Sequence, residues 1–261
     1  MLIEHTLFGV QDKVQIAINR IRQFEPPEGY YVAFSGGKDS IVVLDLIKRA
    51  GVKYDAHYNL TTVDPPELIY YIREHHSDVV ETHRPKETMW QLIPKKRLPP
   101  LRNMRYCCAI LKEGGGKGRL VVTGVRWQES AKRKRRSMVE QCYTDNSKRY
   151  LHPIIDWTKY EIWEYIRSYQ LPYCKLYDEG FQRLGCVMCP MAGAKGMARD
   201  AARWPKIAAM YRWACNRAYE KAVADGLERA RNWASGDEMY EWWIAGKAGI
   251  KELPDQTVIF E

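Results

Sequence analysis

A short polar stretch decides the fold of this chain, and it reads Ser35-Gly36-Gly37-Lys38-Asp39-Ser40. An apolar, β-rich run at residues 30–34 precedes it, and a helical pattern of apolar residues at positions 41–47 follows it and ends at Gly51. Glycines between a strand and a helix let the backbone approach a phosphate closely, and the N-terminus of the helix attracts negative charge. The stretch therefore predicts a phosphate-binding loop, to which Ser35, Lys38 and Ser40 add side-chain donors.

The alternative is that the same residues form an ordinary strand-to-helix turn, because short Gly-Gly loops are common. The length of the stretch and its place between a strand and a helix favour the phosphate-binding interpretation. It is not a Walker-type loop, which requires Gly-x-x-x-x-Gly-Lys followed by Ser or Thr. The sequence therefore points to a different class of nucleotide-binding loop.

Outward from the loop, predicted strands and helices alternate. The predicted strands cover residues 52–60, 78–82, 120–125 and 150–155, and the predicted helices cover residues 7–24, 66–75 and 157–169. At the start of the last helix, Thr158 and Glu161 have the spacing of a capping box. This alternation favours an α/β fold in which a parallel, Rossmann-like sheet carries helices on both faces.

The chain is long enough, at 261 residues, for one main domain with extensions. We expect an N-terminal helix in residues 1–28, a nucleotide-binding domain in residues 29–190 and a helical C-terminal extension in residues 191–261. The formal net charge of +9 favours anionic partners such as nucleotides, phosphate groups or nucleic acid. No targeting segment and no apolar run of membrane-spanning length is evident, so we expect a cytoplasmic protein that binds no membrane.

The cysteines are grouped in a way that favours metal binding. Seven are present, an odd number for a closed disulfide framework, and four of them form the pairs Cys107-Cys108 and Cys186-x-x-Cys189. Four thiolates suit either tetrahedral zinc or an iron–sulfur cluster. Adjacent side chains diverge, which favours a cluster because it offers separate irons to neighbouring thiolates. Three cysteines are predicted to be core residues without a role: Cys142, Cys174 and Cys215.

Further motifs accompany the loop between residues 30 and 190. They are Asp64-Pro65-Pro66-Glu67, Thr123-Gly124-Val125-Arg126 with Glu129-Ser130, His152-Pro153-Ile154 with Trp157, and the stretch from Leu171-Pro172-Tyr173 through Leu176-Tyr177-Asp178 to Gly185-Cys186-Val187-Met188-Cys189. Together with the loop they resemble the phosphoadenosine phosphosulfate (PAPS) reductase family of the adenine-nucleotide alpha-hydrolase (PP-loop) superfamily, in its iron–sulfur form. The resemblance implies the adenine-nucleotide alpha-hydrolase-like version of the predicted fold.

The resemblance also implies ligands and residue roles. It implies ATP or another adenine nucleotide, Mg²⁺, and a [4Fe-4S] cluster on Cys107, Cys108, Cys186 and Cys189. Catalytic roles fall to Lys38, Asp39 and Arg126. The implied nucleotide contacts are Ser35, Gly36, Gly37, Lys38, Asp39, Ser40, Asp64, Gly124 and Arg126.

A basic run, Lys132-Arg133-Lys134-Arg135-Arg136, follows the strand that ends near Arg126. Such a run is often a solvated loop. Its place beyond the carboxyl end of a strand favours a lid over an anionic substrate or a binding site for nucleic acid, and the sequence does not choose between these two.

Reductases of the resembled family carry a cysteine in their C-terminal tail, and residues 255–261 contain none. The intact loop also resembles the family's ATP-cleaving relatives. Both points favour an enzyme that cleaves ATP to pyrophosphate and an adenylated intermediate in sulfur transfer, with nucleic acid as one acceptor and a sulfur-donor protein as a partner. One alternative is a PAPS or adenylylsulfate reductase with an external thiol. Another is a non-catalytic regulator that senses a nucleotide or binds nucleic acid.

Overall fold

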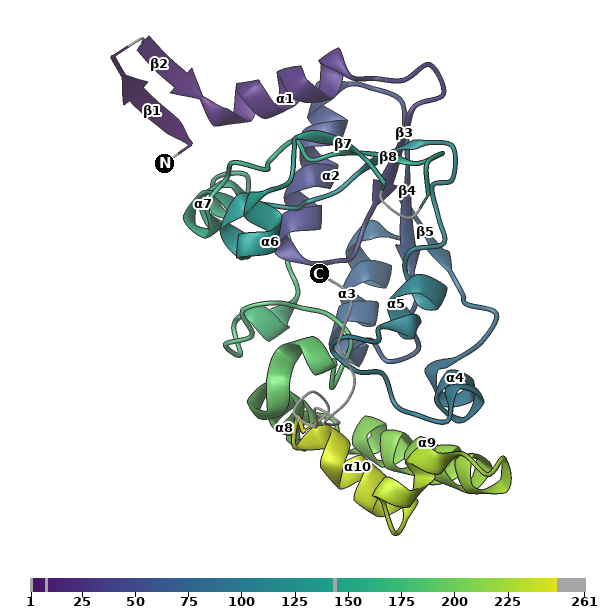
Figure 1. Ribbon diagram of the computed structural model, residues 1–261. Coiled ribbons are helices and arrows are strands. Elements are labelled where there is room, and N and C mark those ends of the chain that lie inside the picture. Colours follow the sequence, from purple (N-terminus) through teal and green to yellow (C-terminus); the bar gives the residue numbers. More distant parts are fainter. Residues whose placement is uncertain (1, 8, 143–144, 248–261) are drawn as a thin grey trace. The chain divides into compact units, whose positions relative to one another are not determined.

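A computed structural model of the chain, shown in Figure 1, describes residues 2–7, 9–142 and 145–247. Its contacts divide the chain into two compact units. The first unit comprises Met1–Asn59, Pro66–His83 and Gly114–Leu184, and the second comprises Leu60–Pro65, Arg84–Glu113 and Gly185–Glu261. The chain therefore passes between the two units several times.

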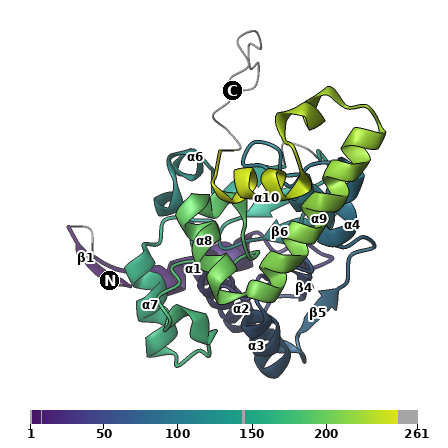
Figure 2. The same cartoon turned by 90° about the horizontal axis from the view of Figure 1, so that it is seen from below.

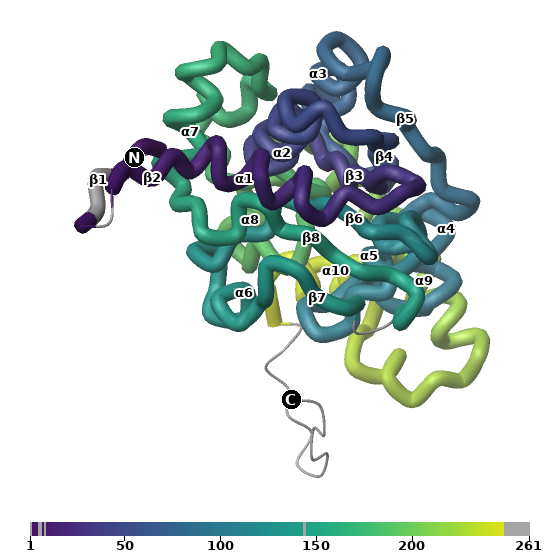
Figure 3. The backbone as a smooth tube through the Cα atoms, turned by 90° about the horizontal axis from the view of Figure 1, so that it is seen from above, coloured from purple at the N-terminus to yellow at the C-terminus, as the bar shows by residue number. Residues whose placement is uncertain are grey.

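The first unit is built on a six-stranded sheet with the strand order β5-β4-β3-β6-β8-β7. Neighbouring strands are parallel except at the edge, where β7 runs antiparallel to β8. Figure 3 shows β3, β4 and β5 side by side. The strands are β3 (Tyr30–Ala33), β4 (Tyr54–Asn59), β5 (Val80–His83), β6 (Leu120–Val122), β7 (Val139–Gln141) and β8 (Arg149–Leu151). The predicted α/β fold with a mainly parallel sheet is confirmed.

Helices of the first unit pack against this sheet and against one another. Tyr30 of β3 donates its hydroxyl to the carbonyl of Ile21 in α1 at 2.6 Å, and Tyr165 of α7 donates to Asp45 of α2 at 2.6 Å. The capping box predicted for α7 is confirmed, since Thr158 accepts from the Glu161 N–H group. The helices are α1 (Lys13–Gln23), α2 (Lys38–Ala50), α3 (Pro66–His76), α6 (Ala131–Lys134) and α7 (Lys159–Ser168), with short 3-10 turns at Trp127–Glu129 and Lys175–Tyr177.

The N-terminal helix begins later than the sequence pattern suggested. β1 (Ile3–Thr6) and β2 (Gly9–Asp12) pair as an antiparallel hairpin, and α1 starts only at Lys13. The prediction of helix from residue 7 onward was therefore wrong for residues 9–12. The physical reason is Asp12, whose carboxylate accepts from the N–H groups of Val14 at 2.9 Å and Gln15 at 3.1 Å and so fixes the first turn.

The second unit is mainly helical, as predicted for the C-terminal part of the chain (Figure 2). α9 packs against both α4 and α10. Tyr211 lies at their meeting point, with its ring centroid 5.1 Å from that of Trp90 and 4.8 Å from that of Trp243. The helices are α4 (Met89–Lys96), α5 (Tyr106–Leu111), α8 (Gly193–Arg203), α9 (Pro205–Ala224) and α10 (Gly236–Ile244), with 3-10 turns at Pro190–Ala192 and Glu228–Asn232. None of the described helices is both long and apolar enough to cross a lipid bilayer.

Candidate nucleotide and metal sites

The predicted phosphate-binding loop lies between β3 and α2 in the first unit. Its two serines close it, because the Ser40 hydroxyl donates to the Gly37 carbonyl at 2.9 Å and accepts from the Ser35 N–H group at 3.2 Å. Gly37 is the N-cap of α2 and has no side chain with which to cap the first-turn N–H groups. Since the N-cap residue occupies none of these donors, the N-terminus of α2 is suited to bind an anion.

Three charged side chains meet beside this helix terminus. Lys38 Nζ lies 3.2 Å from one carboxylate oxygen of Asp39, and Arg126 Nε lies 2.7 Å from the other. Lys38 and Arg126 are only 5% and 4% exposed. Two buried cations on one carboxylate leave an excess positive charge, and a charge out of contact with water attracts an anion more strongly than a solvated one. The predicted catalytic residues Lys38, Asp39 and Arg126 are thus brought together.

Gly124 permits this approach. An added Cβ at this position would lie 2.9 Å from both the Cβ and the carbonyl carbon of Asp39, closer than non-bonded carbons normally come. A side chain there would therefore push Asp39 away from the turn that carries Arg126. Gly124 therefore sets the spacing between Asp39 and Arg126 because it has no side chain.

Tyr177 is a residue of this site that the sequence analysis did not single out. Its hydroxyl accepts from the Lys38 backbone N–H group at 2.9 Å, and Lys38 Nζ lies 5.6 Å from the centre of its ring. Burial raises the pKa of the Tyr177 hydroxyl, so the group stays protonated and keeps a hydrogen to donate. The stretch Leu176-Tyr177-Asp178 was part of the family-like pattern, and it was the available signal.

Asp64, predicted as a nucleotide contact, belongs to the second unit together with the paired cysteines. It is buried, and its carboxylate accepts from the Thr61 N–H group at 2.6 Å. Desolvation opposes a rise in the pKa of the Lys112 ammonium, but the nearby Cys186 sulfur and Asp64 carboxylate outweigh it and raise that pKa. Lys112 therefore stays charged next to a cysteine sulfur.

The four paired cysteines also belong to the second unit. Cys107 and Cys108 lie on α5, and Cys186 and Cys189 flank a turn before the 3-10 turn at Pro190–Ala192. Two hydrogen bonds hold that turn: the Val187 N–H group donates to the Val63 carbonyl at 2.8 Å, and the Met188 N–H group donates to the Asp200 carboxylate at 3.0 Å.

The four thiols influence one another electrostatically. The hydrogen bond with Cys108, burial, and the neighbouring thiols of Cys186 and Cys189 raise the pKa of Cys107, while the same hydrogen bond lowers the pKa of Cys108. Among the described cysteines, no three sulfurs lie within 4.8 Å of one another.

The three unpaired cysteines are more buried than the four paired ones. The paired cysteines are all half-buried, whereas the remaining three are buried: Cys142, Cys174 and Cys215. Burial raises the pKa of the Cys215 thiol to about 12 and also raises that of Cys174. Buried, protonated thiols are poor nucleophiles and poor metal ligands.

The basic run forms α6 and the residues just after it. Arg133 pairs with Glu129 and Arg136 with Glu140, and the Arg136 guanidinium lies 5.8 Å from the centre of the Tyr150 ring. The exposed members of the run are Lys132, Lys134 and Arg135. Part of the positive charge is thus neutralised within the first unit.

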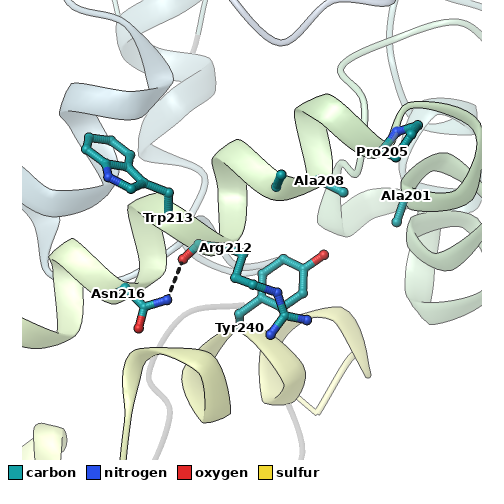
Figure 4. A pocket seen from close by; sticks show the side chains of 8 residues that line it. Ala201, Pro205, Ala208, Arg212, Trp213, Asn216 and Tyr240 are labelled. Carbon is teal, nitrogen blue, oxygen red and sulfur yellow. Dashed lines mark hydrogen bonds between the residues drawn. The ribbon is translucent and has the colours of Figure 1, made fainter.

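A separate hollow of about 490 Å³ lies on the second unit along α8, α9 and α10 (Figure 4). Arg212 lies beside it, 3.1 Å from Asp237 and 4.4 Å from the centre of the Tyr240 ring, and the Asn216 amide donates to the Arg212 carbonyl at 3.1 Å. These polar groups are engaged with one another, and the lining otherwise consists of alanine, proline and tryptophan. The hollow lacks the converging donors of the phosphate-binding loop.

Comparisons of the sequence with known proteins identify its family. A family model of the phosphoadenosine phosphosulfate reductase domain matches residues 29–192. An uncharacterized protein of Methanocaldococcus jannaschii is 29% identical over 188 residues, which are 67% of this chain and only 39% of that protein. The adenosine 5'-phosphosulfate reductase of Bacillus anthracis is 30% identical over 184 residues, covering 66% of this chain and 80% of the reductase.

Among solved structures, the PAPS reductase from Candida auris in a phosphate complex aligns with a TM-score of 0.49 at 18% identity, covering 65% of this chain and 87% of that one. Candida glabrata FMN adenylyltransferase aligns with a TM-score of 0.44 at 18% identity, covering 67% of this chain and 62% of that one. The family assignment rests on the sequence match, which extends over more than half of the 261 residues. The chain belongs to the phosphoadenosine phosphosulfate reductase domain family.

Proposed function

We propose that the protein is an iron–sulfur enzyme that binds ATP at the loop and cleaves it to pyrophosphate and an adenylated intermediate in sulfur transfer. The observation that carries the proposal is the meeting of buried Lys38 and Arg126 on Asp39 at the uncapped N-terminus of α2. Two fixed cations beside a helix N-terminus suit a group on which negative charge develops.

In the proposed reaction, an oxygen of the acceptor attacks the α-phosphorus of ATP. The bond from the α-phosphorus to the bridging oxygen breaks, and pyrophosphate leaves with the electron pair. Lys38, Arg126 and the first-turn N–H groups of α2 would stabilise the charge on the leaving group. Both Asp39 oxygens already face a cation, so we expect the phosphates, rather than Asp39, to supply most of the ligands of Mg²⁺.

We further propose that Cys107, Cys108, Cys186 and Cys189 hold a [4Fe-4S] cluster. The half-buried thiols and their mutual influence on ionisation support this ligand set. When bound, such a cluster supplies a redox-active or electrostatic centre. The proposed role of Lys112 is to balance the negative charge of the thiolates, because its ammonium lies beside Cys186.

The second candidate is an adenylylsulfate reductase that uses an external thiol, and the name of the Bacillus anthracis relative favours it. A reductase with its own nucleophile needs an accessible thiolate. Within the described part of the chain, the cysteines outside the proposed cluster set are all buried. This burial favours ATP cleavage, or reduction that depends on a thiol supplied from outside.

The test is an anaerobic preparation, analysed for iron and sulfide and then incubated in parallel with ATP and with adenylylsulfate plus a thiol. Release of pyrophosphate from ATP supports the proposal. Release of sulfite from adenylylsulfate, without pyrophosphate from ATP, replaces it with the reductase. Tight nucleotide binding without turnover of either compound, in the presence of candidate acceptors and sulfur-donor proteins, identifies a regulator instead.

Replacing Lys38 with alanine is expected to lower nucleotide turnover by about ten- to a hundredfold, because a hydrogen bond to a charged group contributes about 1.5–3 kcal/mol. Asp39→Asn is expected to lower turnover more than binding, because the neutral amide forms no ion pair with Lys38 or Arg126. Steady-state kinetics and nucleotide titration measure the two effects. Lys48→Ala, at the far end of α2, is the control and should match the parent. Equal turnover in all three variants and the parent would contradict a role of the loop.

For the basic run, the exposed members can be neutralised together as Lys132→Ala, Lys134→Ala and Arg135→Ala, which keeps the Arg133 and Arg136 ion pairs. If the run binds nucleic acid, this variant should bind it more weakly. The dependence of affinity on salt concentration should also flatten, by about 0.9 in the logarithmic slope for each duplex phosphate that the variant no longer neutralises. ATP affinity should stay as in the parent. A collapse of ATP affinity would identify the run as a phosphate lid.

A further inference from the structure

A second group of metal-binding side chains lies on the sheet of the first unit. Among the residues that the structure describes, His57, Glu81 and His83 each offer a donor atom, and these atoms lie within 4.8 Å of one another. His57 is on β4, and the other two are on β5. The parallel register places His57 opposite Glu81 and Asn59 opposite His83, so the three side chains meet through strand pairing.

We infer that His57, Glu81 and His83 bind a divalent transition-metal ion such as Zn²⁺, at a site separate from the paired cysteines. Two imidazoles and one carboxylate are a donor set that zinc accepts, and three protein ligands leave a fourth position for water. The Nδ1 atom of His57 lies 2.7 Å from Nε2 of His83 and 3.6 Å from a carboxylate oxygen of Glu81.

The other nitrogen of His57 supports this inference. His57 Nε2 is hydrogen-bonded to Asp55, and Asp55 is itself held by Arg119, whose Nη2 lies 2.5 Å from the second carboxylate oxygen. A histidine whose Nε2–H group donates a hydrogen bond to a carboxylate keeps a lone pair on Nδ1. In His57, Nδ1 is the atom that faces Glu81 and His83. Metal-binding histidines almost always have such a partner on the ring nitrogen away from the metal.

The three ligands differ in how firmly they are held. The His57 side chain is 11% exposed, and its ring stacks on that of Tyr31 at 4.1 Å with an angle of 12°. The side chains of His83 and Glu81 are 38% and 67% exposed. A fixed His57 can therefore serve as the anchor, while the two more exposed side chains turn to complete the coordination.

The position of His57 also connects the site to the phosphate-binding loop. Its backbone carbonyl accepts from the N–H group of Phe34, the residue just before Ser35, at 3.0 Å. β5 is the edge strand of the sheet. An ion held by His57 and by two residues of β5 would link the edge strand to β4. A ligand that binds only the folded state stabilises that state, so the ion should stabilise the sheet.

The competing explanation is a metal-free chain of hydrogen bonds from Asp55 through His57 to His83. Isothermal titration of the anaerobically prepared full chain with Zn²⁺ separates the two. His83→Gln and Glu81→Gln should each lose one equivalent of bound Zn²⁺. Asp55→Asn should keep the equivalent but bind it about 10- to 100-fold more weakly, because Asp55 orients a ligand without being one. The control His75→Gln changes an exposed histidine of α3 outside the group and should bind as the parent does.

Co²⁺ provides a second measurement that does not confuse this site with the cysteines. The ion bound here should show visible d–d bands that disappear in His83→Gln, without the near-ultraviolet sulfur-to-cobalt charge-transfer band. Added Zn²⁺ should also raise the melting temperature of the parent and of His75→Gln but not that of His83→Gln. The inference is overturned if His83→Gln binds the same number of Zn²⁺ equivalents as the parent, or if the parent and His83→Gln gain the same stability from Zn²⁺.

Discussion

Cys186→Ser is expected to lose most or all of the protein's iron and acid-labile sulfide, while Cys142→Ser keeps both. Serine in place of Cys186 leaves one iron of the proposed cluster without its thiolate, and a [4Fe-4S] cluster is held by four cysteine thiolates. Cys142 is buried and belongs to the first unit, whereas the paired cysteines belong to the second. Iron, sulfide and zinc analysis of the two variants and the parent, all prepared anaerobically, checks the expectation.

The same measurement tests the ligand set and the metal separately. Loss of iron from Cys142→Ser, or full iron in Cys186→Ser, would mean that the ligands are assigned wrongly. Stoichiometric zinc without iron or sulfide in the parent would mean that the thiols hold a zinc ion. Cys186→Ser should leave the melting of the first unit, and nucleotide binding at its loop, far less affected than its metal content, because Lys38, Asp39 and Arg126 all belong to that unit.

The elements that the sequence predicted well are those whose own residues determine them. Most side chains of β3 and α2 are buried. The corresponding apolar runs in the sequence are typical of a buried parallel strand followed by a buried helix. α7 carries its start signal in Thr158 and Glu161. The loop between β3 and α2 was predictable for the same reason, since its glycines and charged residues are consecutive.

Features that depend on pairing between distant segments were not predictable. β7 has only the length of a minimal edge strand, and its pairing with β8 depends on residues that follow it in the chain. The approach of Tyr177 to Lys38 joins positions far apart in the sequence. The group of His57, Glu81 and His83 exists only because β4 and β5 align in one particular register, which no local pattern specifies.

Within the phosphate-binding loop, Gly36→Val is expected to be the most damaging single change. Gly36 has a φ of +68°, a conformation that a β-branched residue strongly disfavours. An added Cβ would also lie 2.7 Å from Leu68 Cδ1 and 2.8 Å from Ile72 Cδ1, both on α3. The strain costs about 1–2 kcal/mol, and the overpacking costs a further 1–3 kcal/mol or so.

Gly51→Val is the matched control, because it separates backbone strain from the clash and from the phosphate site. Gly51 ends the same helix with a φ of +70°, but an added Cβ there would meet nothing within 4 Å. Both variants should therefore melt below the parent, and Gly36→Val should melt lower than Gly51→Val. Only Gly36→Val should also lose measurable nucleotide binding, because relief of the clash with Leu68 and Ile72 must move the loop that carries Lys38 and Asp39. If folded Gly36→Val bound ATP and adenylylsulfate as tightly as Gly51→Val does, the loop would be a structural turn, and the nucleotide would have to bind elsewhere.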